Sequence, residues 1–233
     1  RGPRYVFLAV VALIGICVLY KEKIVLKHPV FIPIGLFIFF MFLSAVFSGN
    51  VSTGFIGSSI RYTGAITYIF CVVLFFLAYN YGEYEEIFKP MVYAAAIVAV
   101  IGILQYFGYN FVPYEYHNTS AYSTMGNTNW LATYLVIILP AAVLLYLFFK
   151  NRIMMVCSGI IYAGLLTSLT RGAWLAFFIT FVIICVFLII KKKGLHNLIN
   201  IVIVFSLVTI ILLPANEGLI YKRAFSIPEN IES

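Results

Sequence analysis

The feature that most constrains this chain is the recurrence of long apolar runs along almost its whole length. Each run is about as long as a helix must be to cross roughly 30 Å of hydrocarbon. Only 10% of the 233 residues are charged, whereas a soluble domain has about 25%. The alternation of apolar and polar residues that a transmembrane barrel requires is absent from the sequence. The sequence therefore predicts an all-α, polytopic helical membrane protein.

Polar breaks divide the chain into about eight candidate transmembrane helices. We expect them at residues 4–20, 29–48, 62–80, 91–108, 129–149, 153–169, 173–190 and 198–214. Pro29 and Pro90 fall near two of the expected helix starts, where a missing amide donor costs little. Pro140 falls inside the fifth helix, which we expect it to kink. Residues 1–214 are thus predicted to form one transmembrane bundle.

The distribution of lysine and arginine predicts how the helices are oriented. One set of alternate loops carries nine of these residues, and the other set carries only Arg61 and Arg171. Because positive residues are enriched in cytoplasmic loops, we expect both arginines to face outside. The chain begins at Arg1 and ends at Ser233 in a polar stretch. We expect a piece of a longer protein, in which residues 215–233 are the truncated start of a large external loop.

Two interpretations of the outward arginines remain open. Arg61 and Arg171 are each flanked by glycine and serine residues, which permit close approach of a ligand. They either anchor helix ends among lipid headgroups or act together on an anionic group. The planar guanidinium suits bidentate binding of phosphate better than an ammonium group does.

The longest polar stretch inside the predicted bundle is "YNFVPYEYHNTSAYSTMGNTNW", residues 109–130. Its tyrosines are expected at a membrane interface, but aromatic faces and amide side chains also bind sugars. Tyr122, Asn127 and Asn129 are therefore candidate substrate-binding residues. Thr128 or Asn129 is also a plausible N-cap of the fifth helix, so capping alone is the alternative for both asparagines.

Two further residues are candidates because of their positions. His117 lies in the same external loop and is either a substrate-binding or basic residue of the site or an ordinary loop histidine. Trp174 lies three residues after Arg171. If the helix starts by Arg171, the two side chains share a face and can contact one ligand.

Several classes of function are disfavoured by what the chain lacks. It has no aspartate, and Glu115 is the one acid in a predicted external loop before the tail. A metal-dependent external site is therefore not expected, since hard cations need several oxygen ligands. No nucleotide-binding motif is present, so no cofactor is predicted. The net charge of +7 is carried largely by lysines at helix ends, which indicates anionic lipid rather than nucleic acid as the partner.

Three segments in this order and spacing resemble a known family. They are "GFIGSSIRYTGAITYIFCVVLFF", "MGNTNWLATYLVIILPAAVLL" and "LTSLTRGAWLAFFITFVI", and the resemblance covers roughly residues 52–190. The chain resembles the O-antigen ligase and O-antigen polymerase-like family of bacterial membrane glycosyltransferases. The third segment, a Ser/Thr-Arg-Gly turn before a tryptophan-bearing helix, is the most specific.

The resemblance implies an inverting, metal-independent glycosyltransferase with an all-helical fold of the C type. Such an enzyme takes a glycan from an undecaprenyl diphosphate carrier on the outer face of the bacterial cytoplasmic membrane. It passes the glycan to a polysaccharide, lipid or protein acceptor. The resemblance gives the family's diphosphate-binding role to Arg61 and Arg171. It gives the role of catalytic base to a histidine in a large external loop late in the chain, which is expected to lie outside this segment. A transporter or flippase for lipid-linked glycans is the main alternative function. A non-catalytic membrane scaffold is the third possibility.

Overall fold

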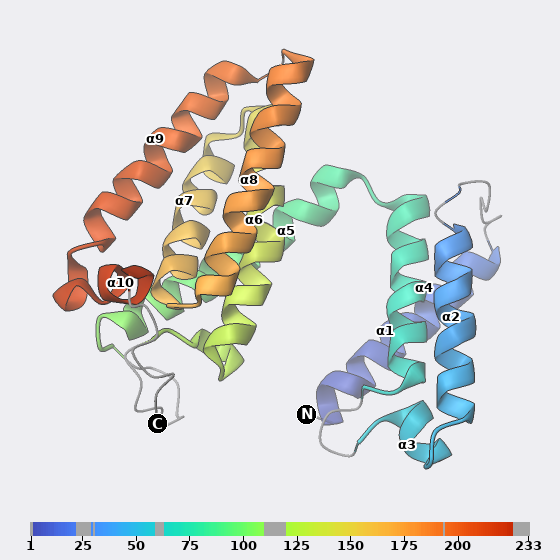
Figure 1. The fold of residues 1–233 in the computed structure, drawn as a ribbon. Helices are drawn as coiled ribbons and strands as arrows, with labels where there is room; N and C mark the ends of the chain where they lie inside the picture. The colour runs from blue at the N-terminus through green and yellow to red at the C-terminus, as the bar shows by residue number, and fades with distance from the viewer. Residues whose placement is uncertain are drawn as a thin grey trace. The chain divides into compact units, whose positions relative to one another are not determined.

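The computed structural model describes residues 2–21, 29, 31–58, 63–109, 120–192 and 194–225. Within these ranges every regular element is helical and no strand forms (Figure 1). The all-α fold class is therefore confirmed for the described residues. The chain divides into two compact units, Arg1–Tyr84 and Glu85–Ser233, and each is described by itself.

Unit 1 contains four helices. They are α1 (Gly2–Lys21), α2 (Phe31–Val46), α3 (Val51–Ile56) and α4 (Ala65–Tyr81). Helix α3 is a short element that the sequence did not predict, and Asn50 caps its start by accepting the N–H of Thr53 at 3.2 Å. Gly64 precedes α4, and a Cβ atom there would lie 2.3 Å from the carbonyl oxygen of Phe55. Glycine is therefore required for the start of α4 to lie against the end of α3.

Unit 2 contains the remaining elements. They are α5 (Tyr84–Tyr106), the 3-10 turn η1 (Ser123–Met125), α6 (Thr128–Phe149), α7 (Arg152–Thr167), α8 (Arg171–Lys191), α9 (Leu195–Leu212) and α10 (Ala215–Phe225). Helix α6 is central and contacts α7, α8 and α9. Leu131, Leu135, Leu139 and Val143, which recur at helical spacing along α6, are fully buried.

Helices α7 and α9 pack closely at a small residue. A Cβ atom on Gly159 would lie 2.8 Å from Cγ1 of Val204, so any larger residue would force the two helices or the Val204 side chain to shift. The sequence predicts such packing from the small residues Gly159 and Ala163, and the contact at Gly159 confirms it. Nearby, the ring of Tyr162 stacks on that of Phe205 with centroids 4.4 Å apart.

Each of the eight predicted helices has a helical counterpart, but helix α5 corrects one expectation. It begins at Tyr84 rather than at 91, so Pro90 lies inside the helix instead of near its start. The earlier start has a physical reason in the sequence. Glu85 and Glu86 occupy the first turn, where carboxylates favour the positive end of the helix dipole. Glu85 also forms an ion pair with Lys89 one turn later.

Three of the described helices are long and apolar enough to cross a membrane: Glu85–Tyr106, Thr128–Phe149 and Arg171–Lys191. The number rises to four if the bent pair His196–Leu212 and Ala215–Phe225 counts as one broken span. Helix α7 has 16 residues, about 24 Å at 1.5 Å per residue. The prediction of a helical membrane protein is supported, whereas eight full spans stay a prediction.

The surface of α8 agrees with a membrane environment. Leu175, Phe178, Ile183 and Ile190 are all more than 60% exposed although they are large and apolar. Soluble proteins rarely leave a contiguous apolar surface uncovered. We therefore take this stripe of α8 to face lipid.

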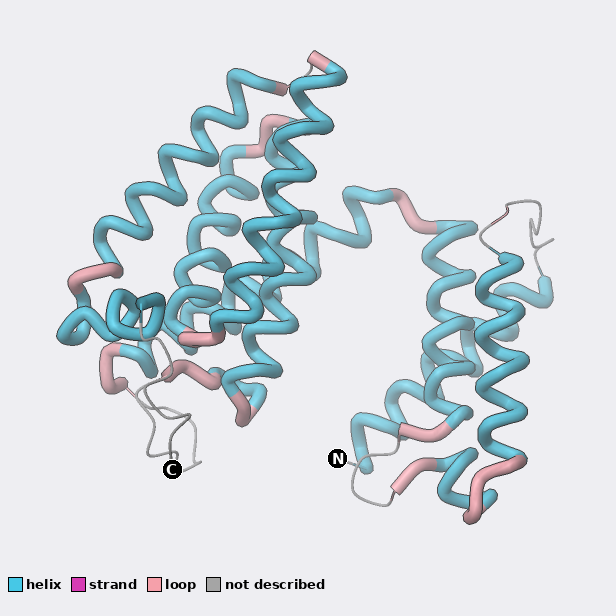
Figure 2. Tube along the Cα trace, in the orientation of Figure 1, coloured by secondary structure: helices cyan, strands magenta, loops and turns pink. Residues whose placement is uncertain are grey.

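The predicted external loop begins with a helix. Helices α9 and α10 meet at an angle of 108°, and Figure 2 shows the break between them as a short loop. Asn216, Glu217 and Gly218 have φ angles of 51°, 57° and 69°, so the backbone is left-handed in the first turn of α10, just after the break. The chain therefore turns back toward the end of unit 2 where α6 and α8 begin (Figure 1).

Candidate functional site

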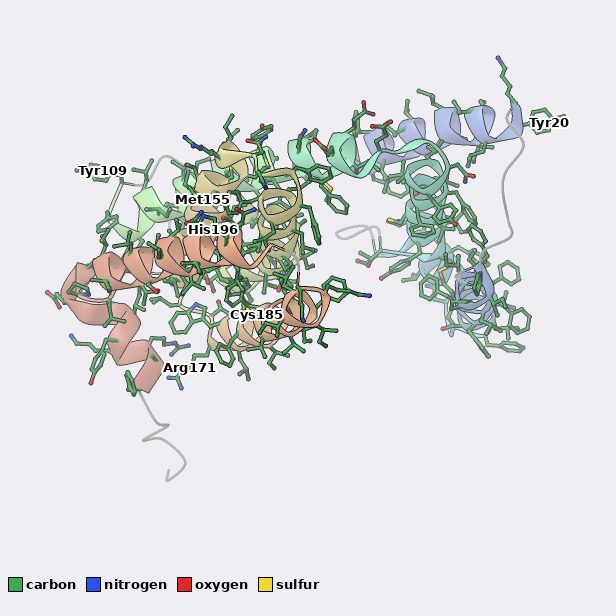
Figure 3. All side chains as sticks on the ribbon, turned by 90° about the horizontal axis from the view of Figure 1, so that it is seen from above. Tyr20, Tyr109, Met155, Arg171, Cys185 and His196 are labelled. Atoms are coloured by element: carbon green, nitrogen blue, oxygen red, sulfur yellow. The ribbon has the colours of Figure 1, made fainter. Side chains whose placement is uncertain are left out.

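A polar cavity of about 830 Å³ lies at the end of unit 2 where α6 and α8 begin. Three cationic side chains line it, namely Arg171 from α8 and Lys222 and Arg223 from α10, and we call it the cationic pocket. In Figure 3 Arg171 is labelled beside the end of α10. The other lining residues are Ser120, Thr128, Asn129, Ser168, Leu169, Thr170, Gly172 and Leu219. No acidic side chain occurs among these described lining residues, so the pocket is suited to an anion.

The turn between α7 and α8 brings Arg171 to the pocket. Ser168 ends α7, Thr170 is extended, and Arg171 is the first residue of α8. Between them Leu169 has a φ of 54°, in the left-handed region. For a residue with a Cβ atom that conformation costs about 1–2 kcal/mol. A strained residue is therefore part of the tight turn that precedes the arginine.

The amino end of α8 faces the pocket without a side-chain cap. Thr170 occupies the N-cap position but makes no capping hydrogen bond. Its hydroxyl donates instead to the carbonyl oxygen of Ser168 at 3.2 Å. A Cβ atom on Gly172 would have no neighbour within 4 Å, so space is open beside the first turn. The positive end of the helix dipole thus adds to the charge of Arg171.

The first turn of α6 contributes a second set of polar groups. Asn127, not Thr128 or Asn129, caps this helix, and its side-chain oxygen accepts the N–H groups of Asn129 at 2.9 Å and Trp130 at 3.3 Å. Capping therefore accounts for Asn127. Asn129 itself lines the cationic pocket, and its Oδ1 lies 3.5 Å from Oγ1 of Thr170.

A buried polar network holds the segment before α6 in place. The side-chain oxygen of Gln105 accepts the N–H of Tyr122 at 3.2 Å and that of Ser123 at 2.6 Å. The hydroxyl of Ser123 donates to the carbonyl oxygen of Val98 at 2.6 Å. Tyr122 is 2% exposed and does not line the pocket. Because buried polar groups need partners, this network ties Tyr122 and Ser123 to α5.

Trp174 lines a different cavity. Its indole N–H donates to the carbonyl oxygen of Leu165 at 2.9 Å. The second cavity, of about 680 Å³, lies among α7, α8 and α9, and we call it the aromatic cavity. Its other aromatic lining residues are Tyr162, Phe177, Phe178, Phe181 and Phe205. Arg171 and Trp174 therefore line two different cavities. The expectation that both side chains contact the same group of a ligand is not met.

The structure brings together only some of the predicted site residues. Arg171 and Asn129 line the cationic pocket. Asn127 caps α6, Tyr122 is buried, and Trp174 lines the aromatic cavity. Arg61 and His117 lie outside the described residues, so their roles stay predictions.

Sequence reasoning missed Lys222 and Arg223 as site residues. A signal for them does exist in the sequence. By the counting of charges in alternate loops, the segment after the eighth helix is expected on the same side of the membrane as Arg171. The bend between α9 and α10 then brings the two cations to the pocket.

No protein-family model matches the chain, and comparisons with curated proteins and with solved structures found no match. The family resemblance therefore stays a prediction, and the chemistry of the two cavities is the physical basis for a function.

Proposed function

We propose that this chain is a membrane glycosyltransferase of the O-antigen ligase and polymerase type. It moves a glycan from an undecaprenyl diphosphate-linked donor to an acceptor on the outer face of the bacterial cytoplasmic membrane. The observation that carries the proposal is the convergence of Arg171, Lys222 and Arg223 on one cavity whose described lining holds no acid.

The cationic pocket fits the chemistry of a departing diphosphate. The acceptor oxygen bonds to the anomeric carbon from the face opposite the diphosphate, and the bond from that carbon to the diphosphate oxygen breaks. The bonding electrons leave with the diphosphate, and Arg171 with its neighbouring cations stabilises the developing charge. The acceptor's proton passes to a general base, a role that the resemblance gives to a histidine in a later loop.

The aromatic cavity supports a donor with an apolar chain. Both cavities take lining residues from the segment 165–174. Leu165 and Trp174 line the aromatic cavity, and Ser168 and Arg171 line the cationic pocket. A ligand with an anionic head and an apolar chain matches this pair of surfaces, and we assign the aromatic cavity to the isoprenoid chain of the donor.

The position of the pocket favours transfer over transport. The cations of the pocket lie at helix starts and on α10, while Lys150, Arg152 and Lys191 lie at the other ends of α6, α7 and α8. A flippase is expected to carry charged groups along a central path through the membrane. The arrangement in unit 2 therefore supports chemistry at one face.

The test is glycan transfer by the full-length protein with a purified lipid-linked donor and candidate acceptors. We expect Arg171→Ala to lower transfer by about 10²–10³-fold, as loss of a charge-stabilising donor does. Arg152→Ala is the matched control, because this exposed arginine lies at the start of α7, away from the pocket. Near-normal transfer by Arg171→Ala contradicts the proposal. Movement of the donor across vesicles without any transfer favours the flippase instead.

A further inference from the structure

We infer that Tyr106 and Asn216 form a clasp that positions α10, so that Lys222 and Arg223 complete the cationic pocket. The two clasp residues are positioning residues and do not themselves line the pocket. The inference rests on the proposed function in one respect, that the ligand of the pocket carries phosphate groups.

The clasp consists of two hydrogen bonds between the end of α5 and the start of α10. The hydroxyl of Tyr106 donates to the carbonyl oxygen of Ala215 at 3.1 Å. In return, the side-chain amide of Asn216 donates to the carbonyl oxygen of Tyr106 at 2.9 Å. Tyr106 is only 2% exposed, so its ring is fixed by its surroundings. Two chain segments that are far apart in sequence are thus bonded at one point.

The clasp lies where the chain changes direction. Asn216 lies in the first turn of α10, just after the break at which α9 and α10 meet at 108°, and it begins a left-handed stretch of backbone. Asparagine tolerates this conformation better than most residues. Beyond the break, Ile220 is 3% exposed and belongs to the core of unit 2. The clasp on one side and Ile220 on the other set the direction of α10.

The consequence of this geometry is electrostatic. Arg171 reaches the pocket from the turn between α7 and α8, whereas Lys222 and Arg223 reach it only because α10 turns back. Two of the pocket's three described cations therefore depend on α10. Loosening the clasp is expected to remove the contribution of Lys222 and Arg223 and to leave Arg171 as the remaining described cation of the pocket.

The experiment uses the full chain in detergent and inorganic pyrophosphate as the probe, with the dissociation constant measured by calorimetry. Tyr106→Phe removes one bond of the clasp. Asn216→Gly removes the other and keeps a residue that accepts left-handed backbone. We expect the variant with both changes to bind pyrophosphate about tenfold more weakly, since each bond contributes on the order of threefold. Tyr146→Phe is the matched control, because it removes a similarly buried hydroxyl that accepts a hydrogen bond from Asn200 at 2.8 Å and lines neither cavity.

A double-mutant cycle separates positioning from a general loss of structure. When Lys222 and Arg223 are both changed to alanine, the clasp changes are expected to have no further effect on pyrophosphate affinity. The salt dependence of binding is expected to become shallower to the same extent in the clasp variant, because the same charges are lost. An equal loss of affinity in both backgrounds, or wild-type affinity in a folded clasp variant, overturns the inference.

Arg171→Ala distinguishes failure of the clasp from failure of the proposed function. If Arg171→Ala weakens pyrophosphate binding and the clasp changes do not, the clasp is wrong and the phosphate site stands. If neither Arg171→Ala nor the clasp changes weaken binding, the assignment of phosphate to the pocket fails. The proposed function and the clasp are then both contradicted.

Discussion

Arg223 on α10 donates a hydrogen bond from Nε to the backbone carbonyl oxygen of Leu169, 3.3 Å away in the turn that precedes Arg171. This bond joins the two segments of the chain that supply the cations of the pocket. Helix α10 therefore does more than add charge, because it also contacts the strained turn that positions Arg171.

This bond predicts that lysine cannot replace arginine at position 223. Arg223→Lys keeps the charge but removes the Nε donor and the planar guanidinium. We expect pyrophosphate binding to weaken by roughly threefold to tenfold, about the value of one hydrogen bond to the turn. Arg223→Gln, which also loses the charge, should bind more weakly still. Equal affinity of wild type and Arg223→Lys in calorimetry contradicts a role for the bond.

The left-handed conformation of Leu169 predicts different effects of two substitutions. Leu169→Val places a β-branched residue at a φ of 54°, where branched side chains are rare. We expect Leu169→Val to lower the free energy of unfolding by about 1–2 kcal/mol and to weaken pyrophosphate binding. Leu169→Asn should retain the turn and bind pyrophosphate within about twofold of wild type, because asparagine accepts left-handed backbone. Similar binding and stability of the two variants argue against strain in this turn.

Two glycines of unit 2 predict opposite tolerances to alanine. A Cβ atom on Gly164 would lie 2.7 Å from Cβ of Ala99, whereas one on Gly172 has no neighbour within 4 Å. We expect Gly164→Ala to destabilise the protein by about 1–3 kcal/mol, because α7 must move away from α5. Gly172→Ala should leave the melting temperature unchanged or slightly higher. Comparable melting temperatures of Gly164→Ala and wild type contradict the close contact.

The aromatic cavity predicts a dependence on the length of the donor's apolar chain. Phe178 lines this cavity and is 64% exposed, so Phe178→Ala should cost little stability. We expect the KM for a long-chain lipid-linked donor to rise several-fold, while pyrophosphate affinity stays unchanged. Ile183→Ala is the control, since Ile183 is similarly exposed on α8 and does not line the cavity. An equal rise in KM for a short-chain donor contradicts the assignment of the cavity to the chain.

The local features of this fold follow from the sequence. Apolar runs and polar breaks predicted the positions of eight helices, and Gly159 predicted a close helix contact that the structure confirms. The sequence predicts a helix at 173–190, and the helix begins two residues earlier, with Arg171 as the first residue of α8. These features depend on hydropathy, residue size and the chemistry of helix ends, which are readable over a few neighbouring residues.

The missed features depend on contacts between distant segments. Lys222 and Arg223 reach the pocket because Asn216 bonds to Tyr106, and no local pattern predicts that pairing. The side chain of Trp174 lies away from the cationic pocket, because its indole N–H donates a hydrogen bond to the carbonyl oxygen of Leu165. Helix content and part of the pocket lining, Arg171 and Asn129, were therefore predictable from the sequence, whereas the contribution of α10 to the pocket was not.

The most direct test of the account is equilibrium binding of undecaprenyl diphosphate to the full-length protein in lipid nanodiscs. Wild type is compared with a variant in which Arg171, Lys222 and Arg223 are all changed to alanine, and with Arg152→Ala as the control. The account predicts wild-type affinity for Arg152→Ala and affinity at least about 100-fold weaker for the triple variant, because it loses three charge-assisted contacts. Unchanged affinity in a folded triple variant contradicts the account.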